Sequence, residues 1–222
     1  MVDTLRILID KQDNFEVVGD QIALILKTEF INQQALALAG GKDPTLWDIR
    51  VFLERSEPWE TFLDDEGAKT PLVNIWFDTE NFAMGKGNTV SQQMADGVFN
   101  LDVYGYGITS ATAGGQNPGD KEAVFEARRG MRLVRNIIMS SLNTYLQLRG
   151  TVARRWPNTI VSFQPEFDGV AVQNIMASRL ALNVLYVEQA PQETGEPLEF
   201  VSVDIKRTED GQIVLEADYD YT

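Results

Sequence analysis

The chain has 222 residues, of which 44% are apolar and 23% charged, so it has a globular composition and enough residues for a sizeable core. It contains neither cysteine nor histidine, which excludes disulfides, thiolate chemistry and the Ser-His and Cys-His nucleophiles of many enzymes. No apolar run approaches the roughly 20 residues that cross a bilayer, and the N-terminus lacks the pattern of a signal peptide, so we expect no membrane partner.

The net charge is −14, but the charges are segregated along the sequence. Residues 121–155 hold eight basic and two acidic residues, a net of +6, so the remainder of the chain carries −20. Such segregation favours an electrostatic contact between surfaces, either within the fold or between copies of the chain. The overall acidity argues against a protein that binds nucleic acid tightly, although it suits a surface past which DNA moves without binding.

The first part of the chain has the periodicity of a helix followed by a strand. Apolar residues over Phe15–Phe30 recur at three- and four-residue spacing, and Gly40-Gly41 provide a stop signal. Alternation over Trp47–Glu54 predicts a strand with one buried face. Pro58 then lies in the first turn of a short predicted helix.

The stretch PLVNIWFDTENF, from Pro71, predicts a strand that runs into a loop over residues 79–97. Asp78 and Glu80 would lie where this strand ends, and two carboxylates there raise the alternative of a Mg²⁺-dependent hydrolase without histidine. They do not match the spacing of a calcium loop, and the Gly85-Lys86-Gly87 segment does not have the spacing of a phosphate loop. We therefore interpret the region as a strand end and a loop, with no metal or cofactor site.

A third strand is predicted at VFNLDVYGYG, residues 98–107, where Gly105 and Gly107 loosen the end of the strand. A second long loop follows over residues 108–119. Two loops of this length inside a compact domain are usually functional or become ordered on contact with a partner.

The longest predicted helix runs from Lys121 to about Leu148, with Asp120 as its candidate N-cap. Its predicted buried face consists of Phe125, Met131, Val134, Ile138, Leu142 and Tyr145. Arg128, Arg132 and Arg135 fall on another face, at four- and three-residue spacing. Either this arginine face is solvated, or it meets the acidic surface of a neighbouring subunit.

The last third of the chain is rich in strand patterns. Residues 159–163 predict one strand, and SRLALNVLYVE, residues 178–188, predicts a central strand because both of its faces are apolar. After a turn-rich linker, the acidic residues 199–222 predict a hairpin with Asp210-Gly211 at its turn. We therefore expect an α+β fold: a mixed or antiparallel β-sheet with helices packed on one face, plus a C-terminal β-hairpin. The expected division is 1–190 for the main domain and 191–222 for the linker and hairpin.

The order of these elements resembles that of the tail terminators of tailed phages, also called tail completion proteins of the neck. The resemblance rests on the N-terminal helix, the strand WDIRVFLER, the strand PLVNIWFDTENF, the strand FNLDVYGYG, the long helix AVFEARRGMRLVRNIIMS and the strand SRLALNVLYVE. It implies an α/β subunit that closes into a hexameric ring, caps the finished tail tube and joins it to the head connector. Closure of such a ring requires two different patches that meet between neighbouring copies.

The resemblance further implies a structural protein of the virion tail or neck, assembled in the host cytoplasm, that is not an enzyme and binds no cofactor. Its partners would be other copies in the ring, the tail tube protein, the head-tail connector protein and, in a contractile phage, the sheath, while DNA passes through the lumen without specific binding. The residues expected at the subunit interface are Arg128, Arg129, Arg132, Arg135, Asp78, Glu80 and Lys86. The alternatives are another head-tail connector or baseplate subunit, and the metal-dependent hydrolase.

Overall fold

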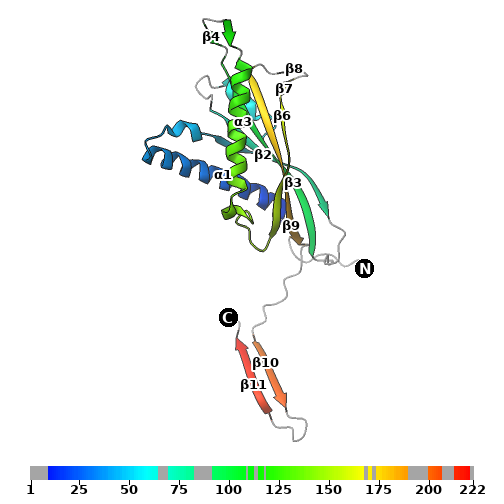
Figure 1. The fold of residues 1–222 in the computed structure, drawn as a ribbon. Helices are drawn as coiled ribbons and strands as arrows, with labels where there is room; N and C mark the ends of the chain where they lie inside the picture. Colours follow the sequence, from blue (N-terminus) through cyan, green and yellow to red (C-terminus); the bar gives the residue numbers. More distant parts are fainter. Residues whose placement is uncertain are drawn as a thin grey trace, which may run out of the picture. The chain divides into compact units, whose positions relative to one another are not determined.

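The computed structural model divides the chain into two units, which we describe separately (Figure 1). The larger unit is Lys11–Ala190, and the smaller one comprises residues 1–10 and 191–222. The structure describes residues 10–64, 70–82, 92–108, 110–112, 115–117, 119–167, 170–171, 174–189, 200–206 and 213–220.

The larger unit is built from two long helices, a five-stranded sheet and short connecting elements. In chain order these are α1 (Asn14–Ala39), η1 (Pro44–Trp47), β1 (Arg50–Leu53), η2 (Pro58–Glu60), α2 (Thr61–Asp64), β2 (Leu72–Phe82), β3 (Gln92–Tyr106), β4 (Ser110–Thr112), β5 (Gly115–Asn117), α3 (Gly119–Ile138), η3 (Ser141–Asn143), β6 (Val152–Phe163), β7 (Glu166–Phe167), β8 (Val170–Ala171) and β9 (Ile175–Gln189). The smaller unit contains β10 (Phe200–Lys206) and β11 (Ile213–Asp220).

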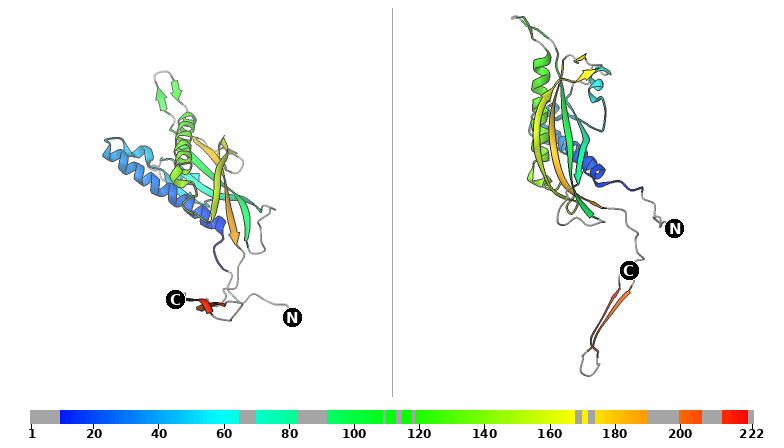
Figure 2. Two further views of the ribbon diagram at one scale, coloured as in Figure 1. Left: turned by 60° about the horizontal axis from the view of Figure 1, so that its bottom comes forward. Right: turned by 90° about the vertical axis from the view of Figure 1, so that its right-hand side faces the viewer.

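The main sheet has the strand order β1-β2-β3-β9-β6. β1 runs parallel to β2, and the other neighbouring strands are antiparallel, so the sheet is mixed. Figure 2 shows α3 lying along one side of this sheet. The predicted α+β fold is therefore confirmed, and β9 occupies an interior position in the sheet, as its apolar faces predict.

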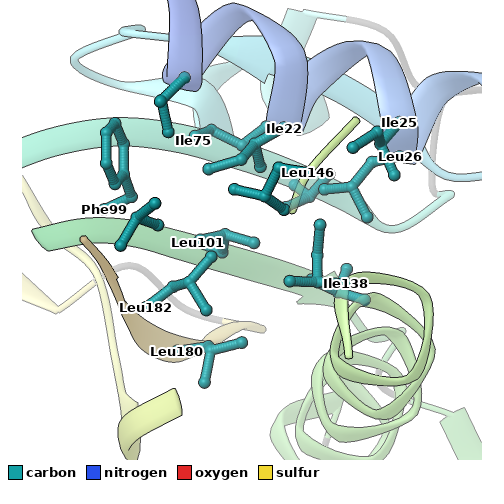
Figure 3. Close-up of a cluster of buried hydrophobic side chains, with 14 of the residues drawn as sticks. Ile22, Ile25, Leu26, Ile75, Phe99, Leu101, Ile138, Leu146, Leu180 and Leu182 are labelled. Carbon is teal, nitrogen blue, oxygen red and sulfur yellow. The ribbon is translucent and has the colours of Figure 1, made fainter. Parts of the chain in front are cut away.

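The main core lies between this sheet and the two long helices (Figure 3). Ile22 and Leu26 of α1 and Ile138 of α3 are completely buried in one cluster, so both helices cover the same face of the sheet. The strand residues of that cluster drawn in Figure 3 include Ile75, Phe99, Leu101, Leu180 and Leu182. These positions alternate along their strands, so the residues that predict the strands by their period of two are also the residues that the sheet contributes to the core.

A row of aromatic rings extends this core toward the start of α1. The rings of Phe15 and Phe77 stack at 4.6 Å, Phe99 lies 5.5 Å from Phe77, and Tyr186 lies 6.5 Å from Phe99. Tyr186 covers Gly97, where a Cβ atom would come within 2.7 Å of the tyrosine ring. A residue without a side chain is therefore required beneath this ring.

The predicted N-terminal helix is confirmed as α1, and its ends have local causes. The backbone N–H of Asp13 donates to the Glu16 carboxylate at 2.8 Å, which is one half of a capping box. At the other end, the N–H of Gly40 donates to the carbonyl of Leu36 at 3.0 Å. The helix continues through Gly19, which packs against the core.

The long helix α3 ends at Ile138, ten residues before the predicted end at Leu148. The Asn143 side chain donates to the carbonyl of Ile137 at 2.9 Å, which satisfies a carbonyl at the end of the helix. From β6, Arg155 donates to the carbonyls of Asn143 at 2.7 Å and Ser140 at 2.9 Å. These bonds stabilise the turn at η3, and they come from residues beyond the helix.

The predicted buried face of this helix is wrong at three positions. Phe125, Leu142 and Tyr145 are 57%, 87% and 37% exposed, whereas Met131, Val134 and Ile138 are buried as predicted. Leu142 changes face because it belongs to η3 and not to α3. Phe125 lies on the side of α3 that faces away from the sheet.

The two predicted loops also need correction. Residues 79–82 belong to β2 and residues 92–97 to β3, so the predicted loop 79–97 is wrong at both of its ends. Residues 83–91 of that prediction lie outside the described residues. Within residues 108–119, β4 and β5 pair as a small antiparallel ladder beyond the start of α3 (Figure 2). The predicted strand at 159–163 is the end of the longer strand β6.

Gly105 and Gly107, which we expected to loosen β3, are sites where α3 approaches the sheet closely. A Cβ atom on Gly105 would lie 2.6 Å from the backbone nitrogen of Ala127, and one on Gly107 would lie 2.8 Å from that of Ala123. Both would also collide with backbone carbonyl oxygens of α3. Glycine is therefore needed here for packing.

The other face of the sheet has a smaller core beneath η2 and α2. Trp59 and Phe62 pack there with Leu72, Tyr104 and Ile175. In the smaller unit, β10 and β11 pair antiparallel, which confirms the predicted C-terminal hairpin. The predicted turn at Asp210-Gly211 lies outside the described residues.

Candidate functional site

The exposed side of α3 carries a row of basic residues. Arg128, Arg132 and Arg135, which we call the arginine stripe, are exposed, while Ala127 and Val134 face the core. No arginine of the stripe has a hydrogen-bond or ion-pair partner within the part of the chain that the structure describes. The stripe is thus a concentrated positive surface on a protein whose net charge is −14.

The stripe continues toward the start of α3 with one cation and one ring. Lys121 lies 6.0 Å from the ring centre of Phe125, and both side chains are exposed. Together with the arginine stripe they form a surface of arginines beside an exposed aromatic ring, two residue types that are enriched at protein interfaces.

Arg129 has a different environment from the stripe. Its guanidinium binds the Glu126 carboxylate at 2.8 Å and also donates to the carbonyl of Leu46. Arg129 therefore links α3 to η1 within its own chain. Its distinct role has no signal in the sequence, because Leu46 is 83 residues away.

Asp78 and Glu80 lie inside β2 and not at the start of a loop. The ladder between β2 and β3 has a bulge at Asp78, whose side chain is exposed. Two residues on, the Glu80 carboxylate accepts a hydrogen bond from the Tyr186 hydroxyl at 2.9 Å. Lys86 lies outside the described residues.

Glu80 belongs to a group of acidic residues that we call the carboxylate cluster: Asp13, Glu80 and Glu188. Glu188 accepts from the backbone N–H of Phe15 at 3.2 Å. Burial raises the pKa of Glu188, and the negative charges of Glu80 and Asp13 raise it further. Burial and the neighbouring carboxylates also raise the pKa of Tyr186. These charges repel one another, so a cationic partner would relieve the repulsion.

A second group of charged residues is completely satisfied within the fold. Asp102, only 1% exposed, accepts two hydrogen bonds from Arg179, at 2.7 and 2.8 Å, and one from the indole of Trp76 at 3.0 Å. The Arg179 guanidinium lies between the rings of Trp76 and Phe163, at 4.8 and 5.0 Å. These bonds to Asp102 raise the pKa of Arg179.

This buried pair lines a cavity of about 310 Å³ on the sheet face opposite the helices. Tyr104, which lines the same cavity, has a raised pKa because it is buried and lies near Asp102. We assign the pair a structural role, because each of its charges has its partner inside the chain. Sequence analysis did not identify it, since Asp102 and Arg179 are 77 residues apart.

A larger groove of about 520 Å³ lies between α1 and the end of α3. Its apolar lining comes from Leu24 on α1, from Leu133 and Ile137 on α3, and from Leu142. Five amide side chains complete much of the wall: Asn32, Gln33, Asn136, Asn143 and Gln147. The sequence analysis missed this groove, although the apolar outer residues of α1 were a signal for it.

Among the described residues, no group of three or more histidine, cysteine or carboxylate side chains is arranged to hold a metal ion. Within the same part of the chain, no helix has both the length and the apolar character needed to cross a membrane. A search against models of protein families found no match, and no curated protein matched the sequence.

Proposed function

We propose that the chain is a structural subunit of a hexameric ring that ends the tail tube of a tailed phage and joins it to the head connector. The resemblance in element order supports this proposal, because α1, β1, β2, β3, α3 and β9 follow one another as in the tail terminator pattern. In this role the protein belongs to the virion tail or neck. Its partners are other copies, the tail tube protein, the connector protein and, in a contractile phage, the sheath.

The observation that carries the proposal is the presence of two unlike, oppositely charged surfaces on one chain. The arginine stripe lies on the outer side of α3, and the carboxylate cluster lies where α1 begins and β9 ends. A ring closes through heterologous contacts, in which one patch meets a different patch on the next copy. Arginines of one subunit beside the carboxylates of the next would form such a contact.

The charge of the remaining surface fits the passage of DNA. Outside residues 121–155 the chain carries −20, which repels the phosphate backbone. If the arginine stripe is covered in the ring, little positive charge is left for DNA to bind. The DNA then passes through the lumen without specific contacts.

The proposal is tested by light scattering on the purified protein over a concentration series, with negative-stain images of the same samples. We expect six-fold rings, either in the free protein or after mixing with purified tail tubes. The rings should sit at one end of the tube only, since a terminator acts where elongation stops. Binding along the whole tube, or no ring with or without tubes, would overturn the proposal.

Labelling the protein in intact particles separates this function from that of another virion component. A label at the junction between tail tube and head connector supports a terminator. A label at the far end of the tail would instead indicate a baseplate subunit, and a label inside the portal region would indicate a connector.

A further inference from the structure

The solvent side of α1 is unusually apolar for an exposed helix surface. Leu24, Ile31 and Leu38 are 55%, 56% and 70% exposed, and they follow one another at seven-residue spacing. Thr28 and Ala35, also exposed, lie between them, so the five residues recur at spacings of four and three. We call this row the α1 outer stripe.

α1 is therefore apolar on two sides. Its inner side contributes Val18, Ile22 and Phe30 to the core, and all three are buried. A helix that is hydrophobic on opposite sides is normally covered on both. Among the described residues, only the inner side is covered.

The exposed apolar surface continues beyond α1. Leu24 lines the groove between α1 and the end of α3, and Leu142, at 87% exposure, lines the same groove from η3. Exposed apolar residues gathered in this way, beside a groove with a mixed apolar and amide lining, mark an interaction site. Spacings of four and three are the pattern of a helix that packs along another helix.

We infer that the α1 outer stripe pairs with the same stripe of a second copy, with the two helices antiparallel. The stripe alternates large and small residues, and the order large-small-large-small-large is the same when it is read from either end. Such a surface is complementary to itself about a two-fold axis near Ile31. About this axis Leu24 of one helix lies against Leu38 of the other, Ile31 lies against its counterpart, and Thr28 lies near Ala35, so the stripe meets apolar side chains along its whole length.

The charges on α1 favour the antiparallel orientation. The start of the helix is acidic, with Asp13, Glu16 and Asp20 exposed, so a parallel pair would bring two acidic ends together. An antiparallel pair separates the two acidic ends, and it also places the two helix dipoles in opposite directions, which is favourable. Between Asp20 and the end of α1, the only charged residues are Lys27 and Glu29, so the middle of the pair contains little charge to desolvate.

This contact does not depend on the proposed ring, because it uses a different surface and a different symmetry. A two-fold contact joins two copies and stops, whereas the contact between the arginine stripe and the carboxylate cluster continues around a ring. In the free protein the pairing covers the outer side of α1.

The absence of cysteine allows a direct test by cross-linking single-cysteine variants of the full chain. Ile31→Cys lies near the proposed axis, so a short bismaleimide should link it to its counterpart and give a covalent dimer. Asn158→Cys, at an exposed position on β6, is the matched control and should stay unlinked. Leu24→Cys and Leu38→Cys should not link alone but should link when mixed, which identifies the antiparallel orientation.

A second measurement uses the mass of the free protein. In the background of Arg132→Glu and Arg135→Glu, where the proposed ring contact is removed, light scattering should give a dimer, and adding Ile31→Glu should lower the mass two-fold. The circular dichroism of the Ile31→Glu variant should be unchanged because Ile31 is exposed. A monomer in that background, an unlinked Ile31→Cys variant, or a dimer that survives Ile31→Glu would overturn the inference. Replacing Arg132 and Arg135 with glutamate should leave the cross-link intact, so failure of the ring proposal can be distinguished from failure of this one.

Discussion

Asp102 is the one charged residue that is buried among the described residues. It is almost completely buried, and its two oxygens accept three hydrogen bonds from Arg179 and Trp76. Asp102→Asn keeps the shape but leaves the partly buried guanidinium without its counter-charge. Because the Arg179 side chain is 33% exposed, water can solvate part of the charge that remains. We therefore expect a loss of about 1.5–3 kcal/mol in the free energy of unfolding, measured by urea titration.

Asp96→Asn is the matched control for this prediction, because Asp96 lies on the same strand and accepts a hydrogen bond from Asn183 at 3.0 Å. Its replacement retains an acceptor and should cost no more than about 1 kcal/mol. Equal losses at the two positions would show that the pair of Asp102 and Arg179 has no special weight in stability.

Glu188 should destabilise the free subunit at neutral pH. Its pKa in the folded state is raised by burial, Glu80 and Asp13, so its charged form is disfavoured there. Because the folded pKa is raised, the folded state binds the Glu188 proton more tightly than the unfolded state does, and this difference stabilises the fold. The stabilisation is fully present below the unfolded pKa of about 4.5 and is lost as the pH rises through the folded pKa. Glu188→Gln should therefore be more stable than the natural chain at neutral pH.

Urea titrations of both proteins, from about one pH unit below the unfolded value of 4.5 up to neutral pH, measure this difference. The two stabilities should converge at the acidic end, where Glu188 is protonated in both states. If the carboxylate cluster is the partner of the arginine stripe, the same variant should also assemble less well. A stability difference that grows toward acid would contradict the assigned cause of the pKa shift.

At the scale of residues, the sequence predicts which positions share a strand face but not which polar groups meet across the sheet. Asp102 falls on the face opposite Leu101 and Val103, as the alternation predicts. Its partner Arg179 comes from β9, and Tyr186 on the same strand binds Glu80 on β2. Such pairs are set by the strand order and register, for which a single sequence has no local signal.

At the scale of elements, two glycines should respond in opposite ways to alanine. Gly105→Ala would force its new Cβ atom against the backbone of α3, so we expect a loss of about 1–3 kcal/mol from overpacking. Gly19→Ala adds a Cβ atom at 3.8 Å from Phe99, an ordinary contact, within α1. It should stabilise the protein by about 0.5–1 kcal/mol, since glycine is unfavourable inside a helix.

Thermal and urea unfolding of the two alanine variants test this pair together. Gly105 and Gly19 both lie where a helix faces the sheet, so they form a matched comparison. They differ in the space available for a Cβ atom and in that Gly105 lies in a strand and Gly19 in a helix. A stabilising Gly105→Ala substitution would mean that α3 can move away from β3 without loss of packing.

The start and end of α1 were predictable because their signals are local, whereas the end of α3 was not. The capping box at Asp13 and the glycine at Gly40 can be read from the sequence. The break after Ile138 depends on Arg155, which reaches back from β6. Likewise, Thr79–Phe82 has the composition of a loop, and it is held as strand by the ladder to β3.

At the scale of the whole molecule, the eight basic residues of 121–155 separate into three groups. Arg129 and Arg155 form hydrogen bonds within the chain, and Lys121, Arg149 and Arg154 lie over aromatic rings. The arginine stripe has no hydrogen-bond or ion-pair partner among the described residues. The segregation of charge was evident in the sequence, but this division required the structure. The apolar outer side of α1 was missed because its inner side explains the helical period by itself.

The arginine stripe should control assembly without affecting folding. Because Arg132 and Arg135 are exposed on α3, replacing both with glutamate should leave circular dichroism and urea stability nearly unchanged. The substitution brings negative charge against the carboxylate cluster of the next subunit, so we expect the protein to lose both ring formation and tube capping. Negative-stain imaging measures the rings, and sedimentation with tail tubes measures the capping. Because salt screens ion pairs between arginines and carboxylates, the natural assembly should also be weaker at high salt.

The combined substitution Arg149→Glu and Arg154→Glu makes the same change in net charge at exposed positions outside the stripe, where each guanidinium lies over an aromatic ring. This control should still assemble, because the change in net charge alone acts only weakly through a screened solvent. If both double variants lose assembly to the same extent, general repulsion between acidic subunits is the cause. If neither does, the stripe faces solvent, and the contact that closes the ring must be sought on another surface.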